Sequence, residues 1–390
     1  MIHSISAKNF QSLFHEVTLD LTTNRKASER NEGYATGVDG TRVILIQALI
    51  GGNASGKTTM LKALAFIKWL QVDSFRWNPE RNLPIKGFAG SKAGVKSPTE
   101  FTVTFELSED LYEYAVSVTK TRIISESLHI TSLTSVRRTS KRVFLRSWNK
   151  QTKTYDISDS YFKLKEPYWV SDELRTTSVI AAAAKFGNEK ATAFTRYWRN
   201  IKTNIDIVDR YMPYQYQAYR ALERYNDNKQ LKEDAEADIR KYDLGIASFG
   251  KDGSILHKSG DTTFELELEE ESSGTQQLLA LKARVDHVLK NGGVALIDEL
   301  NAYLHPLMVE AVIEKFKNPK INIGKGQFLF STHDINVFNL LDPYQMSLAE
   351  KDAQGATSIK RLDGEKIRST DSYMKRYLAG YYGGLNKIEP

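Results

Sequence analysis

Gly51-Gly52-Asn53-Ala54-Ser55-Gly56-Lys57-Thr58 fits the pattern G-x-x-x-x-G-K-T, and its surroundings decide how the fold is interpreted. Glycines allow a tight turn whose successive backbone N–H groups point at phosphate oxygens. The Lys57 ammonium suits phosphate, and the Thr58 hydroxyl suits Mg²⁺. An apolar run at 43–50 predicts a buried strand before the pattern, and residues 59–67 predict a helix after it. A chance glycine-rich turn would lack this context, so we predict a P-loop. The predicted nucleotide-binding residues are Gly51, Asn53, Ala54, Ser55, Gly56, Lys57, Thr58 and Thr59.

Composition narrows the class of protein. The chain has 390 residues, of which 41% are hydrophobic and 26% charged, as in an ordinary globular protein of one large or two smaller domains. It contains no cysteine, which excludes disulfides, thiolate catalysis, cysteine-ligated zinc and iron–sulfur clusters. We find no signal-peptide pattern at the N-terminus and no apolar run long enough to span a bilayer, so we expect a cytoplasmic protein without a membrane partner.

The formal net charge of +6 permits an acidic partner such as nucleic acid. Basic residues concentrate at 137–142, and Arg146 and Lys150 extend this cluster. A solvated hairpin edge, kept from aggregating by its charge, explains the cluster equally well. Nucleic acid therefore stays an open partner.

The order of patterns along the chain predicts an α/β fold with two additions. Ile2–Phe10 alternates like an edge strand, and the alternation at 100–165 predicts an antiparallel block. Helical patterns dominate 172–240, and an α/β pattern follows from about 262. We predict a P-loop part with the antiparallel block at 1–170, a helical insertion at 171–250, a second α/β part at 251–350 and a tail at 351–390.

Three later motifs carry further chemistry. Residues 293–299 form an apolar strand ending in Asp298, suited to Mg²⁺, and Glu299, suited to deprotonating water. Residues 327–334 form a strand ending at His333, whose imidazole could contact a γ-phosphate, although a surface histidine would look the same. Ser273, Gly274 and Gln276 begin a helix as an anion site, and Ser273 with Gln276 also has the spacing of a capping box.

Together these motifs resemble the ABC-type ATPase superfamily. The resemblance makes Ser273-Gly274-Thr275-Gln276 the signature, Asp298 the Walker B aspartate, and Glu299, His333 and Lys57 catalytic. It implies a P-loop core sheet with an antiparallel β subdomain, ATP and Mg²⁺ as cofactors, and a head-to-tail dimer in which each signature covers the partner's ATP. Residues 301–306 fall in the D-loop position. The Q-loop glutamine has no assigned place, and the loop at 86–88 is the best region for it.

Different branches of the ABC-type ATPase superfamily resemble this chain to different degrees. Ser273 lies about 215 residues after Thr58, roughly twice the interval in transporter ATPase subunits. The chain has neither the long coiled coil nor the cysteine zinc hook of SMC-type repair ATPases, and fewer than sixty residues follow His333, too few for the nuclease domain of OLD-type enzymes. The chain is most similar to stand-alone RecF/OLD-like ATPases of prokaryotic abortive-infection and anti-phage systems, of the RloA and AbiL type. The similar segments are 10–12, 112–114, 123–128, 176–179, 243–246 and 377–384.

This resemblance implies an ATPase that forms ADP and phosphate and regulates a separately encoded effector, such as a nuclease. Two alternatives stay open. One is a RecF/SMC-like repair or recombination ATPase that binds duplex DNA. The other is an ATP-binding scaffold with little turnover.

Overall fold

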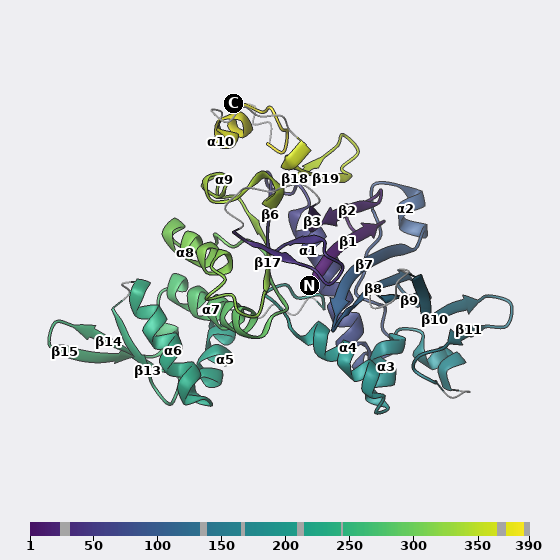
Figure 1. Ribbon diagram of the computed structural model, residues 1–390, viewed down its shortest axis with the longest axis horizontal. Coiled ribbons are helices and arrows are strands. Elements are labelled where there is room, and N and C mark those ends of the chain that lie inside the picture. The colour runs from purple at the N-terminus through teal and green to yellow at the C-terminus, as the bar shows by residue number, and fades with distance from the viewer. Residues whose placement is uncertain are drawn as a thin grey trace.

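A computed structural model describes residues 1–23, 32–132, 139–164, 168–208, 214–242, 245–364 and 372–385. Two large sheets organise this part of the chain (Figure 1). One has six strands in the order β12-β16-β17-β6-β18-β19 and contains the P-loop strand. The other has seven antiparallel strands in the order β11-β10-β9-β8-β7-β1-β2.

The six-stranded sheet is the core of the nucleotide-binding part. Its first five strands run parallel and β19 runs antiparallel to β18. Every residue of β6, β16 and β17 is buried, as expected for parallel strands covered by helices on both faces. The strands are β6 (Ile46–Ile50), β12 (Ile201–Thr203), β16 (Val294–Ile297), β17 (Gln327–Thr332), β18 (Met346–Lys351) and β19 (Thr357–Arg361).

Alternate residues of this sheet enter two different hydrophobic cores. Leu49, Leu296 and Leu329 pack with α1 (Lys57–Val72), whereas Ala48 and Ile297 pack with helices of the opposite face. The helices of that opposite face are α7 (Ser273–Asn291) and α8 (Pro306–Lys317). The helix predicted after the P-loop is therefore confirmed and is longer than its apolar pattern indicated.

The predicted antiparallel block is confirmed, but β1 is not an edge strand. It pairs with β2 on one side and β7 on the other, so Ser4 lies opposite both Asp20 and Thr104. Its alternation arises because one face of the sheet is solvated, not because the strand lacks a neighbour. The strands are β1 (Ile2–Lys8), β2 (Val17–Asp20), β7 (Thr99–Leu107), β8 (Asp110–Val118), β9 (Ile123–Ser132), β10 (Thr139–Asn149) and β11 (Thr154–Asp159).

The single strand predicted at 43–50 is two strands in different sheets. β5 (Arg42–Ile44) pairs with β3 (Thr22–Thr23) and β4 (Tyr34–Thr36), and β6 enters the core sheet. Leu45 lies at the change of partner. Its N–H donates to the Gly33 carbonyl at 2.9 Å, and its carbonyl accepts from Phe328 N–H at 2.6 Å. Both strands are buried, so hydrophobicity gives no sign of the break.

The helices predicted at 177–186, 214–226 and 229–240 are confirmed, but the region 171–250 packs in two places. α3 and α4 join the core of α1, while α5 and α6 pack with α7 and lie beside β13–β15 (Figure 1). The region predicted as loop at 78–98 contains a short helix, α2, and β18 crosses residue 350. The remaining elements are α2 (Lys92–Lys96), α3 (Val179–Lys185), α4 (Glu189–Arg199), α5 (Tyr214–Asn226), α6 (Lys229–Ile239), α9 (Val337–Leu340), α10 (Tyr373–Leu378), β13 (Ile246–Phe249), β14 (Ile255–Ser259) and β15 (Thr262–Leu266).

Arg146 does not belong to a basic surface. Its side chain is fully buried and pairs with Glu126 at 2.9 Å. Residues 139–142 are exposed, as the predicted cluster requires. Arg137 and Arg138 of that cluster, and Asp243 and Leu244 of the segment 243–246, lie outside the described residues.

Candidate nucleotide site

The P-loop joins β6 to α1 through residues in unusual backbone conformations. Ala54 has φ 62° and Gly56 has φ 104°. A side chain on Gly56 would also collide with Thr357, whose hydroxyl donates to the Ser55 carbonyl at 2.8 Å. No side chain caps α1, so its first N–H groups remain available to an anion. Contact with Thr357 therefore fixes the loop, while the N–H groups at the start of α1 remain available as donors.

Strand order brings the separate motifs to one edge of the core sheet. β17 lies between β16 and β6, and all three run parallel, so their carboxyl ends meet at the same edge. Asp298 and Glu299 follow β16, His333 follows β17, and the P-loop follows β6. Motifs separated by more than 200 residues thereby form one constellation.

Asp298 is the centre of this constellation. Its Oδ1 accepts a hydrogen bond from the Thr58 hydroxyl at 3.0 Å and another from the Ser331 hydroxyl at 2.6 Å. Ser331 Oγ in turn accepts from the Glu299 N–H at 2.8 Å. Because the Thr58 hydrogen points to Asp298, the lone pairs of the hydroxyl oxygen remain for a cation. The two residues predicted to hold Mg²⁺ therefore lie together.

Lys57 is almost fully buried. Its ammonium donates to the carbonyls of Gly51 and Gly52, both at 2.8 Å. Burial lowers the Lys57 pKa, against the opposing effect of Asp298 and Glu299. The ammonium thus lies against the first turn of the loop, within the field of both carboxylates.

His333 lies beside these groups with its imidazole mainly uncharged. Burial and the neighbouring Lys57 charge lower its pKa, while Glu299 and the Gly51 backbone oppose the shift. Its backbone N–H donates to Asn301 Oδ1 at 3.2 Å, and the same oxygen accepts from the Thr332 hydroxyl at 3.0 Å. Asn301 therefore orients the end of β17, a role its position in the predicted D-loop did not indicate.

Asn204, which the sequence did not single out, holds the end of β16. Its side-chain Oδ1 accepts from the Asp298 N–H at 2.8 Å, and its Nδ2 donates to the Asp298 carbonyl at 2.9 Å. The amide extends the parallel pairing of β12 and β16 by one step, because it offers the donor and acceptor of a backbone peptide. An asparagine just after a short strand is a common loop residue, so no spacing signal marks it.

Replacing Asn204 by alanine is expected to lower the free energy of unfolding by about 1–3 kcal/mol, because the Asp298 peptide loses both partners in a half-buried place. Chemical denaturation measures this change. The exposed Asn339 provides the control, and N339A should change stability by less than about 0.5 kcal/mol. Equal effects of the two variants would contradict the positioning role of Asn204.

The predicted start of the signature helix is displaced by one residue. Ser272, not Ser273, caps α7, with its Oγ accepting from the Thr275 N–H at 3.1 Å. Gln276 turns inward and donates to the carbonyls of Leu268 and Glu271 at 2.9 and 3.0 Å. Cap formation by Ser272 leaves the exposed Ser273 hydroxyl facing outward, beside the half-buried Gly274.

Ser273, Gly274 and the inward-turned Gln276 are the predicted site residues that the fold leaves apart from the P-loop. No hydrogen bond among the described residues joins any of them to residues 51–59. Gly274 packs instead under the Tyr303 carbonyl, which a Cβ would approach to 2.9 Å. Within the described residues, the P-loop, Asp298 and His333 therefore lie together, whereas the predicted signature residues make no hydrogen bond to them.

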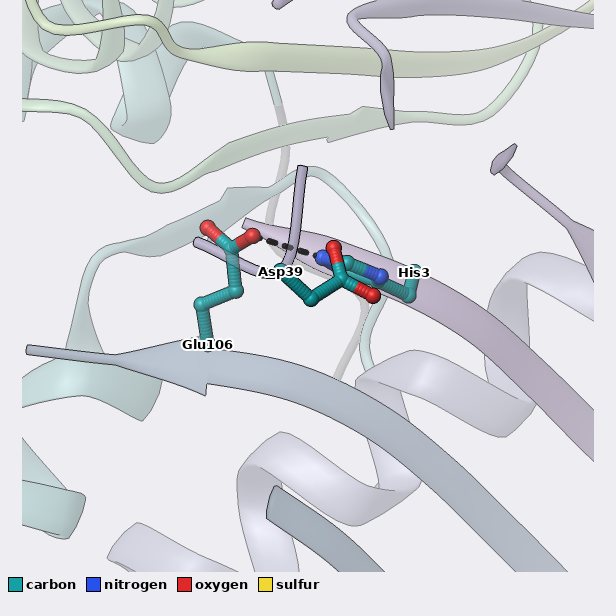
Figure 2. A group of neighbouring side chains, drawn as sticks. All are labelled: His3, Asp39 and Glu106. Carbon is teal, nitrogen blue, oxygen red and sulfur yellow. Dashed lines mark hydrogen bonds and ion pairs between the residues drawn. The ribbon is translucent and has the colours of Figure 1, made fainter. Parts of the chain in front are cut away.

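A second group of potential metal ligands lies away from this edge. His3, Asp39 and Glu106 bring their ligand atoms within 4.8 Å of one another (Figure 2). His3 Nε2 and Glu106 Oε1 are 2.7 Å apart, and the same oxygen accepts from Val38 N–H at 2.8 Å. Asp39 accepts from the backbone and hydroxyl of Thr41. These contacts join β1, β7 and the loop before β5, which gives the group a structural explanation.

The comparisons place these motifs in a known family. Residues 46–339, about three quarters of the chain, match the family described as "AAA domain, putative AbiEii toxin, Type IV TA system". The chain belongs to this family. The match extends from the P-loop strand to beyond His333 and so contains every predicted site residue.

One curated relative is the Septu protein PtuA of Bacillus mycoides (strain KBAB4). It is 30% identical over 125 residues, which cover 30% of this chain and 17% of that protein. Among solved structures, the SMC head domain from Thermotoga maritima has a TM-score of 0.44 at 15% identity, covering 93% of this chain and 99% of that one. An SMC head bound to the C-terminal winged-helix domain of ScpA has a TM-score of 0.43 at 13% identity, covering 93% and 98%.

The family match confirms the predicted relationship to P-loop ATPase domains of AbiEii-type proteins. The predicted α/β fold, with a core sheet that carries the P-loop and a separate antiparallel sheet, is confirmed by the strand order and pairing. Among the described residues, no helix is both long and apolar enough to cross a membrane.

Proposed function

We propose that this chain is a cytoplasmic ATPase that hydrolyses ATP to ADP and phosphate and thereby regulates an effector in anti-phage defence. One observation carries the proposal. The Thr58 hydroxyl and the Asp298 carboxylate, 240 residues apart in sequence, are 3.0 Å apart at the mouth of the P-loop, beside Lys57, Glu299 and His333. This is the arrangement that phosphoryl transfer to water requires.

The residues present fit ATP with Mg²⁺. The backbone amides of residues 53, 54 and 56–58, which make no hydrogen bond within the described residues, and the Lys57 ammonium would hold the phosphates. The Thr58 hydroxyl would bind Mg²⁺ directly, and Asp298 would bind it through the water shell of the ion. When bound, Mg²⁺ neutralises charge on the β- and γ-phosphates. Ser331 and Asn204 keep the Asp298 carboxylate and peptide in place for this role.

Glu299 is the proposed general base and His333 the proposed γ-phosphate contact. Glu299 has φ 52°, an uncommon left-handed conformation for a residue with a side chain. Its backbone is held there by Ser331 and by the Ala302 N–H, which donates to its carbonyl at 2.9 Å. The Glu299 side chain is exposed at this turn, next to the half-buried Asp298. The His333 imidazole, whose pKa is lowered by burial and by Lys57, would contact the γ-phosphate.

Completion of the site would require a second copy of the chain. Ser273 is exposed at the start of α7, and nearby Tyr303 and Leu307 expose 64% and 67% of their surfaces. Exposed apolar side chains beside a polar anion-binding turn suit a protein–protein interface. The proposed dimer is head-to-tail, with Ser273 and Gly274 of each copy covering ATP held by the P-loop of the other. ATP binding would join the heads and hydrolysis would separate them.

The defence role rests on the comparisons. The family description names a toxin of a toxin–antitoxin system, and the partial relative is a Septu protein. The constellation described above contains groups for ATP chemistry alone. The proposed output is therefore a separately encoded effector, such as a nuclease, whose activity follows the open or closed state of the heads.

The first test compares the unaltered protein with Lys57→Ala. The unaltered protein should release phosphate from ATP in a Mg²⁺-dependent way, and K57A should bind ATP at least tenfold more weakly, because it loses a charge-assisted contact worth about 1.5–3 kcal/mol. Fluorescent-nucleotide titration and a phosphate-release assay measure the two effects. Lys62→Ala, on the same helix, is the matched control and should behave like the unaltered protein. Absence of ATP binding by the unaltered protein would refute the proposal.

A further inference from the structure

Helices α5, α6 and α7 enclose a cleft at the far end of the signature helix. The cleft has a volume of about 190 Å³, and its lining includes Arg224, Asn228, Asp286, His287 and Lys290. His287 lies 14 residues after Ser273 on α7. His287 contacts Asn200, which precedes β12, whereas Asp298 and the P-loop follow their parallel strands, so the cleft lies toward the opposite edge of the core sheet from the nucleotide site.

Arg224 enters this cleft without a carboxylate partner. Its guanidinium donates to Nδ1 of His287 at 2.7 Å, and the opposite ring nitrogen, Nε2, lies 3.2 Å from Asn200 Oδ1. A histidine that accepts at Nδ1 is neutral and leaves the arginine charge uncompensated. Asp286, the acidic side chain among the lining residues, is engaged by Lys282 at 2.9 Å and by the Tyr225 hydroxyl at 3.3 Å.

Three further positive charges lie in the same region as Arg224. Lys290 of α7 lines the same cleft, and Lys202 of β12 is close enough to repel both Arg224 and Lys68 of α1. Within the described part of the chain, no carboxylate forms an ion pair with Lys202, Arg224 or Lys290, and Lys68 has a loose pair with Asp73 at 3.7 Å. We call the cleft lined by Arg224 and Lys290, together with the adjoining Lys202 and Lys68, the basic cleft.

The pKa values of Lys202 and His287 are both lowered, as expected where positive charge is in excess. Burial, followed by repulsion from Arg224 and Lys68, lowers the Lys202 pKa to about 8. Burial, followed by repulsion from Lys202 and Arg224, lowers the His287 pKa to about 4. A bound polyanion would relieve both repulsions, which is the direction expected of a site built for negative charge.

We propose that the basic cleft binds the phosphate backbone of a nucleic acid. Four cations contributed by four elements exceed what one phosphate group can contact, whereas a strand presents phosphates in succession. Arg224 is held by His287 with its remaining donors free for phosphate oxygens, the geometry in which arginine binds phosphate best. The proposal does not depend on ATP hydrolysis, because none of these residues belongs to the nucleotide site.

The test measures binding of short labelled DNA and RNA, single- and double-stranded, to the full chain by fluorescence anisotropy over a series of salt concentrations. Arg224→Glu/Lys290→Glu should weaken binding by at least about tenfold and reduce the slope of log K against log salt by about 2. The matched control is Arg220→Glu/Lys229→Glu, which changes the same charges at exposed positions on α5 and α6. It should bind within about twofold of the unaltered protein at moderate salt, where long-range charge effects are screened. ATP binding by each variant checks that the fold is intact.

Two competitors test whether another negatively charged ligand binds the cleft in place of nucleic acid. Pyrophosphate should compete only weakly, and poly-glutamate should not displace the nucleic acid at equal charge concentration. Equal losses in the cleft and control variants would overturn the proposal, as would absence of nucleic-acid binding at low salt. Poly-glutamate binding as tight as nucleic-acid binding would instead assign the cleft to an acidic protein partner, and tight pyrophosphate binding would assign it to a small phosphate ligand; either result would overturn the proposal.

Discussion

Glu299→Gln is expected to lower ATP turnover by about 100-fold or more while leaving ATP affinity within about twofold. Glutamine keeps the shape of the side chain but cannot take a proton from water, and general bases contribute about 10²–10⁴ to rates. The backbone contacts of residue 299, with Ser331 and Ala302, do not involve its side chain and should survive. Single-turnover phosphate release and nucleotide titration measure the two quantities.

The same variant should accumulate as a closed dimer in ATP, because hydrolysis is the step proposed to separate the heads. Light scattering with and without ATP detects this change of mass. Glu310→Gln, an exposed position on α8, is the chemical control and should leave both turnover and mass unaltered. Rapid turnover by E299Q would mean that another group is the base.

Local chemistry explains why the sequence predicted so much of this site. Each motif sits directly at the carboxyl end of a strand, so residues 43–50, 293–297 and 327–332 place their own functional groups wherever those strands lie. The order of the strands, which sequence does not give, then brings Thr58 to Asp298. The strand ends, the P-loop pattern and the family resemblance together were enough to choose the residues, but they could not show that the residues meet.

The residues that the sequence analysis missed depend on contacts distant in sequence, whereas the misplaced cap of α7 is a local error. Asn204 holds a peptide 94 positions away, and Ser331 holds one 32 positions away. Neither residue has a spacing pattern, because its partner is chosen by strand order. The cap of α7 was misplaced because Ser272 and Ser273 are chemically identical, and only the direction of the preceding chain selects Ser272.

The burial of Arg146 could likewise not be predicted from its charge. In the sequence it extends a basic cluster, but the alternation of β10 turns it into the core. There it donates to Glu126 at 2.9 Å and to the carbonyls of Leu174 and Thr177 at 3.2 and 2.7 Å. Glu126 also accepts from Ser178, at the start of α3. The Arg146–Glu126 pair therefore joins the antiparallel sheet to the helices that pack on α1. An argument from composition alone would assign both charges to the surface.

Arg146→Ala is expected to lower the free energy of unfolding by about 3–5 kcal/mol, because it leaves the Glu126 carboxylate buried without its counter-charge. Chemical denaturation measures the loss. Arg142→Ala, at an exposed position of the same strand, should cost less than about 0.5 kcal/mol.

The double variant Glu126→Gln/Arg146→Met distinguishes two ways in which Arg146 could stabilise the fold. If Arg146 stabilises the fold by neutralising Glu126, the double variant should lose clearly less free energy of unfolding than Glu126→Gln and Arg146→Met lose together. The reason is that the double variant contains no uncompensated buried charge. If Arg146 matters mainly because it donates to the Leu174 and Thr177 carbonyls, the costs should add, because methionine cannot replace those donors. We expect the costs to fall below additivity, because a carboxylate with no exposed surface is the most expensive group in this cluster to leave unpaired.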